Sequence, residues 1–122
     1  MTISGTCGNQ VIGTLNELQQ VLRESRTGVF GEFWIGEKDQ PTLAIHTNGD
    51  LAYLHYFPEH GHPGFQAVGD VNLEGEVLFK MAGQADFTMR RAVVVSVDQA
   101  YQAAAEFFTS RSMLGCIKWS EL

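Results

Sequence analysis

The dipeptide Asn48-Gly49 stands between two short runs of alternating apolar and polar residues, 42–47 and 50–57. Such a pair favours a two-residue type I′ turn, because both of its central residues adopt positive φ readily. The sequence therefore predicts a β-hairpin with a register set by that turn. The predicted pairs are Ile45 with Ala52, Leu43 with Leu54, His46 with Leu51, Ala44 with Tyr53, and Thr42 with His55.

The two faces of this hairpin differ in chemistry. Successive side chains of a strand point to opposite faces, so the register sorts the residues into two sets. One set is aliphatic and predicts a core face: Leu43, Ile45, Ala52 and Leu54. The other set contains His46, Tyr53 and His55, and we expect it to face solvent or a partner, since an antiparallel sheet can be wet on one side.

Two helices flank the hairpin in the sequence. Residues 14–26 begin with Thr14 and Glu17, and residues 97–109 follow Ser96 and Gln99; both pairs have the spacing of a capping box. Further strands are predicted at 29–35, 65–69, 76–81, 91–95 and 116–119, from their β-branched and aromatic content. This order predicts one α+β domain over residues 1–122, with an antiparallel or mixed sheet of about five to six strands and two helices packed on one face.

The charge balance restricts the kinds of partner. The chain has 14 acidic residues against 8 Lys and Arg, a formal net charge of −6. Nucleic-acid binding requires a basic surface, so we expect no nucleic-acid partner, whereas a basic protein partner fits this charge. The first residues lack a signal-peptide pattern, and no apolar run approaches the roughly 20 residues of a membrane span. These features predict a soluble cytoplasmic protein with no membrane partner, either a monomer or a homodimer.

A histidine-rich loop is the one candidate for metal chemistry. His55, His60 and His62 lie close together in the sequence, with Glu59 between them. Imidazole and carboxylate groups are suitable zinc ligands, but this spacing matches no known zinc signature. We therefore expect no metal, no cofactor and no catalytic residue, and hence no enzyme. The alternative is a small metal-binding or ligand-binding, enzyme-like domain that uses this loop.

Several short motifs occur in a characteristic order over most of residues 29–119. They are an aromatic strand with Trp34, the Gly49-Asp50 turn, a Tyr-containing strand, the turn Pro63-Gly64-Phe65 with Gln66, the helix end Glu106-Phe107-Phe108, and the terminal Ile117-Lys118-Trp119. In this order the chain resembles the Imm1 family of immunity proteins from bacterial polymorphic toxin systems. It departs from the family pattern after the last helix, where residues 109–115 contain Arg111 but no proline.

This resemblance implies a non-catalytic inhibitor. A protein of this kind binds a cognate toxin, often a nuclease or a nucleic-acid deaminase, and neutralises it by occluding the active site. The toxin is expected to be basic, because its own substrate is a polyanion. We therefore expect the partner-binding residues on the polar face of the hairpin and in the loop that follows it: His46, Tyr53, His55, Glu59, His60 and His62.

Overall fold

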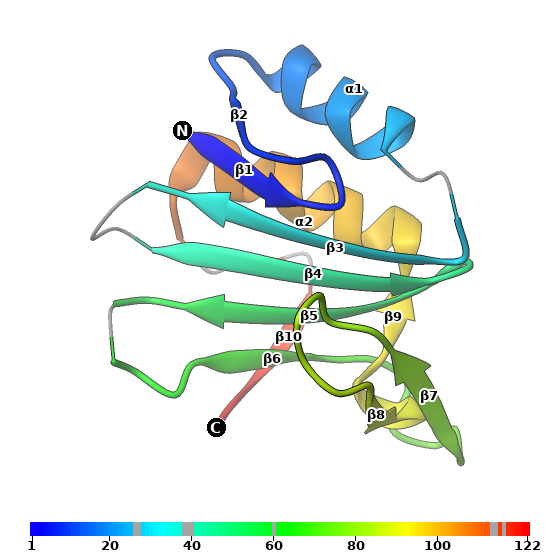
Figure 1. The fold of residues 1–122 in the computed structure, drawn as a ribbon. Helices are drawn as coiled ribbons and strands as arrows, with labels where there is room; N and C mark the ends of the chain where they lie inside the picture. The colour runs from blue at the N-terminus through cyan, green and yellow to red at the C-terminus, as the bar shows by residue number, and fades with distance from the viewer. Residues whose placement is uncertain (26–27, 38–40, 60, 113–114, 116) are drawn as a thin grey trace.

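Antiparallel pairing organises the chain (Figure 1). The computed structural model describes residues 1–25, 28–37, 41–59, 61–112, 115 and 117–122. Within them, eight strands form one sheet in the order β10-β6-β5-β4-β3-β1-β2, with β9 paired to β5. The bounds are β1 Thr2–Gly5, β2 Gln10–Val11, β3 Phe30–Gly36, β4 Thr42–Asn48, β5 Leu51–Phe57, β6 Phe65–Val68, β9 Val95–Ser96 and β10 Lys118–Glu121.

Both helices pack on the same face of this sheet (Figure 1). Helix α1 spans Leu15–Glu24 and α2 spans Val97–Ser110. The hydroxyl of Thr14 accepts a hydrogen bond from the backbone N–H of Glu17 at the start of α1. At the start of α2, Ser96 and Gln99 form the predicted reciprocal capping box, which satisfies two backbone donors. Local sequence therefore determines where each helix begins.

The main core lies between the sheet and the helices. The predicted aliphatic face of β4 and β5 is buried there, together with Phe33 of β3 and Phe107 of α2. Ala100, Ala103 and Ala104 of α2 are fully buried against the sheet. These small side chains allow the helix to approach closely, and the aromatic residues fill the remaining volume.

A second hairpin lies on the other face of the sheet (Figure 1). It consists of β7, Glu76–Phe79, and β8, Phe87–Arg90, followed by a short 3-10 helix, η1, Arg91–Val93. Val77 and Phe79 alternate with exposed residues along β7, so one face of the hairpin is apolar. That face forms a second hydrophobic cluster with Tyr53, Val93 and Val94.

The α+β class, the two helices on one face and the central hairpin are confirmed, and the sheet has more strands than predicted. The predicted register is wrong by two residues: Asn48 pairs with Leu51, and Ile45 pairs with Leu54. Gly49 and Asp50 are therefore the central turn residues, and Gly49 alone has positive φ, as in a type II′ turn. An even shift keeps every side chain on its predicted face, so the core assignment remains correct.

Three parts of the chain differ from the predicted elements. The N-terminal strands β1 and β2 and the strand β8 were not predicted. Residues 91–95 were predicted as a strand, but only Val95 belongs to one, because the 3-10 turn precedes it. The last strand begins at Lys118, and Cys116 of the predicted 116–119 strand lies outside the described residues.

Within the described part of the chain, neither helix has the length and apolar character needed to cross a membrane.

Candidate partner-binding surface

The β7–β8 hairpin covers part of the sheet face that was expected to be open. His46 is 2% exposed and Tyr53 is 5% exposed. The ring of Phe87 meets His46 edge-on at 5.1 Å, and Phe79 lies 6.2 Å from Tyr53. The prediction that these two side chains face solvent is therefore wrong, because the hairpin covers them. The apolar face of the β7–β8 hairpin has to be buried, and this half of the sheet buries it.

The other half of the same face remains uncovered and carries an aromatic patch. The patch consists of Trp34 from β3 and of His55 and Phe57 from β5, each of them half-buried. The Phe57 ring stacks on His55 at 3.9 Å and on Trp34 at 6.0 Å. Ala44 lies between Trp34 and His55 in the register and is buried. Its small side chain leaves room for the flanking rings, which form a preformed apolar surface.

The loop after β5 is fixed beside this patch by its own histidines. Nε2 of His55 lies 2.8 Å from the carbonyl oxygen of Pro63, so that nitrogen donates a hydrogen bond. The N–H of Gly64 donates to Nδ1 of His62 at 2.7 Å. Gly64 has a φ of +91°, and a Cβ there would lie 2.5 Å from His55. Burial lowers the pKa of His55, and its hydrogen bond with Pro63 opposes this effect.

These contacts engage one ring nitrogen of His55 and one of His62. His60, the third expected ligand, lies outside the described residues. Among those that are described, no group of three or more His, Cys, Asp or Glu side chains could hold a metal ion. The geometry of His55 and His62 instead supports a structural role in the loop.

Acidic side chains stand next to the patch and the loop. Glu59 is exposed two residues after Phe57. Glu121, also exposed, lies 3.7 Å from Nε2 of His62. Glu37 follows β3 and pairs with the N-terminal ammonium at 3.2 Å and with Arg111 at 3.8 Å. The exposed carboxylates of Glu59 and Glu121 give this edge of the molecule negative charge, which attracts a basic partner.

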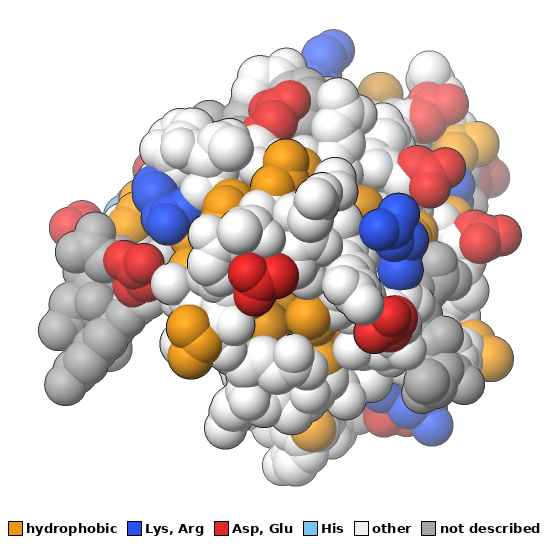
Figure 2. All heavy atoms as spheres, turned by 90° about the horizontal axis from the view of Figure 1, so that it is seen from above, with side chains coloured by type: hydrophobic (Ala, Val, Ile, Leu, Met, Phe, Trp, Pro, Cys, Tyr) orange, Lys and Arg blue, Asp and Glu red, His pale blue; other side chains and the backbone are white. Residues whose placement is uncertain are grey.

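The molecule looks different from the side of α1. Viewed from there, acidic side chains alternate with basic ones and with scattered hydrophobic groups among the described residues (Figure 2). Such mixed surfaces are ordinary for a soluble domain. The aromatic patch with its acidic neighbours is a more distinctive candidate for recognition.

Sequence reasoning missed two members of this patch. Neither Trp34 nor Phe57 was among the expected partner-binding residues. A usable signal was present, because Phe57 has the same strand parity as Tyr53 and His55 and must share their face. Parity also places Trp34 on that face, since it pairs with Ala44.

Residues 10–121, nearly the whole chain, match the model of a protein family described as Immunity protein Imm1. No curated protein matches the chain.

Proposed function

Because the chain belongs to the Imm1 family of immunity proteins, we propose that it is a non-catalytic inhibitor that binds a cognate bacterial toxin. The family match is the observation that carries this proposal. An inhibitor needs a rigid, shape-matched surface rather than a catalytic constellation. In this role the protein acts in the cytoplasm of the cell that produces the toxin, as part of a polymorphic toxin system.

The proposed contact surface is the aromatic patch together with the 58–64 loop. Trp34 and Phe57 offer a large apolar area and lose little side-chain entropy on binding, so we expect each to contribute strongly to affinity. His55, Glu59 and His62 remain candidate contact residues around them, as does His60 by its place in the sequence. His46 and Tyr53 support the surface from beneath the hairpin, since both are buried.

The proposed toxin is a nuclease or a nucleic-acid deaminase, and the proposed mechanism is occlusion of its active site. An active site for a polyanion carries positive charge. The net charge of −6 and the exposed Glu59 beside the patch are opposite in sign to the charge of such an active site. The attraction between them speeds association. Bound there, the acidic surface would take the place of the substrate phosphates.

Co-expression tests this function in cells. The neighbouring toxin-like gene product is induced in a bacterial host, with and without this chain. We expect growth arrest without the chain and normal growth with it. Continued arrest, with the chain shown to be soluble and abundant, would reject the pairing. A matched pair of variants, Phe57→Ala in the patch and Phe108→Ala on α2, then shows whether protection depends on the proposed surface.

A further inference from the structure

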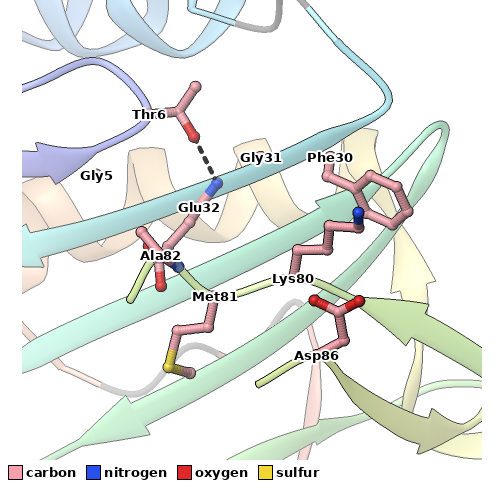
Figure 3. A pocket seen from close by; sticks show the side chains of 9 residues that line it. All are labelled: Gly5, Thr6, Phe30, Gly31, Glu32, Lys80, Met81, Ala82 and Asp86. Carbon is pink, nitrogen blue, oxygen red and sulfur yellow. Dashed lines mark hydrogen bonds between the residues drawn. The ribbon is translucent and has the colours of Figure 1, made fainter. Parts of the chain in front are cut away.

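A pocket opens where the start of β3 meets the loop between β7 and β8 (Figure 3). Its volume is about 350 Å³. Glu32 and Phe30 line it from β3, and Lys80, Met81 and Asp86 line it from the β7–β8 loop. Glu32 lies two residues before Trp34 on the same strand, and its side chain has the same parity. The pocket therefore borders the aromatic patch on one sheet face.

The Glu32 carboxylate has few hydrogen bonds for a group so deeply placed. Its side chain is only 11% exposed. One oxygen accepts a long hydrogen bond of 3.4 Å from the N–H of Ala82, and the other lies 3.9 Å from Nδ1 of His46. A carboxylate can accept about four hydrogen bonds, and burying one without them is unfavourable.

His46 is the second under-satisfied group at this place. Its side chain is 3% exposed, and Nδ1 has no hydrogen-bond partner. The ring is hydrogen-bonded to the backbone of Lys80, and Nε2 is the nitrogen involved because Nδ1 has no partner. Nδ1 is then free to accept a hydrogen bond when the ring is neutral. When the ring is neutral, Nδ1 of His46 and Oε2 of Glu32 are thus two acceptors that face each other without a donor between them.

The described cations of this chain do not supply that donor. The ammonium of Lys80 lies over the Phe30 ring, 5.0 Å from its centre. Among the described residues, the one ionisable partner within ion-pair distance of Glu32 is the His46 imidazole, which carries a charge only when it is protonated. Figure 3 shows the carboxylate of Asp86 beside the Lys80 side chain at the same pocket. An incoming cation would therefore meet one carboxylate at the mouth and a second one deeper in.

We propose that this pocket receives an arginine side chain of the toxin. This inference rests on the proposed function and names the chemistry of one anchor. A guanidinium group is planar, carries five N–H donors and is weakly hydrated, so it can donate to a carboxylate and stack on an aromatic ring at once. The carboxylates of Glu32 and Asp86 provide the acceptors, and the Phe30 ring, over which the Lys80 ammonium lies, provides the apolar wall.

A small probe tests the pocket without the toxin. N-acetyl-arginine amide is titrated into the ¹⁵N-labelled protein, and N-acetyl-citrulline amide serves as a neutral probe of the same shape. We expect saturable shifts at the amides of Phe30, Glu32 and Ala82 with the arginine probe, weaker shifts with citrulline, and loss of the arginine effect in Glu32→Gln. Equal shifts with both probes, or none at these amides, would overturn the inference.

The toxin complex supplies the second test. Glu32→Gln is nearly isosteric, and we expect it to weaken toxin binding about tenfold or more. Glu24→Gln on α1 removes the same charge far from the pocket and should change affinity less than about twofold. Equal effects of the two changes would overturn the arginine pocket while leaving the immunity function intact. Absence of toxin binding by the unaltered protein would instead overturn the proposed function, and the toxin arginine with it.

Discussion

Nδ1 of His46 lies 3.9 Å from Oε2 of Glu32, across the β3–β4 pair and beneath the β7–β8 hairpin. Both residues also contact the hairpin loop, His46 through the backbone of Lys80 and Glu32 through the N–H of Ala82. Binding of this hairpin to the sheet therefore includes buried polar contacts in addition to the apolar cluster around Phe79.

The buried imidazole makes stability depend on pH. Burial lowers the pKa of His46 below its usual 6.5, with a smaller opposing effect from the Glu32 carboxylate. Between the two pKa values the unfolded chain binds a proton that the folded protein does not. The contribution of the neutral His46 ring to the free energy of unfolding is thus fully present above about pH 6.5. It is lost as the pH falls through the pKa of His46 in the folded protein.

We expect thermal unfolding to show this loss. The decrease in melting temperature from about pH 7.5 to about pH 5.5 should be smaller in His46→Gln than in the unaltered protein. His55→Gln should change the slope in the same direction, because burial also lowers the pKa of His55. Parallel curves for all three proteins would show that neither imidazole contributes.

The β7–β8 hairpin should unfold together with the sheet. Phe79 is fully buried, whereas its neighbour Leu78 points to solvent. We expect Phe79→Ala to lower the free energy of unfolding by about 3–5 kcal/mol and Leu78→Ala by less than about 1 kcal/mol. Urea denaturation measures both. A loss below about 1 kcal/mol for Phe79→Ala would mean that the hairpin opens independently of the fold.

The loop after β5 offers a glycine pair for testing its rigidity. Gly61 and Gly64 both have positive φ, but only at Gly64 would a Cβ meet other atoms, among them Nε2 of His55 and the carbonyl of Tyr56. We expect Gly61→Ala to be destabilising by about 1 kcal/mol, from backbone strain alone. Gly64→Ala should be destabilising by clearly more and should weaken toxin binding. Equal losses of stability would contradict the close packing of this loop on His55.

The aromatic patch should contribute directly to toxin affinity. Truncation of a central interface aromatic often lowers affinity by about 2 kcal/mol or more, roughly thirtyfold. We expect Phe57→Ala and Trp34→Ala to show losses of this size in calorimetric titration. Phe108→Ala removes a half-buried aromatic from the helix layer and should leave affinity within about threefold. An equal loss for Phe108→Ala would point to a different contact surface.

Local sequence predicts much of this fold. The caps at Thr14 and Ser96 mark the helix starts, and the period of two in β4 and β5 identifies the core face. The register was less secure, because Asn48-Gly49 and Gly49-Asp50 are both acceptable turn centres and give registers that differ by two residues. The face assignment survived that difference because the shift was even.

The candidate site was predictable only in part. The sequence places His55 on the strand before the loop and Glu59 in the loop, and the structure leaves Glu59 exposed. The burial of His46 and Tyr53 depends on where the β7–β8 hairpin packs. That packing joins residues far apart in the sequence, so local sequence patterns do not predict it. Glu32 lines one pocket with Lys80 and Asp86 for the same reason, because the β7–β8 loop that packs beside β3 lies about fifty residues later in the sequence.

Binding and inhibition of the cognate toxin test the central claim most directly. The purified chain is titrated into the purified toxin, and the activity of the toxin, proposed to act on nucleic acid, is followed in the same samples. The account predicts a tight one-to-one complex in which activity falls to zero at equivalence, and weaker inhibition by Phe57→Ala. A toxin that stays active at saturating concentrations of the unaltered protein would contradict it.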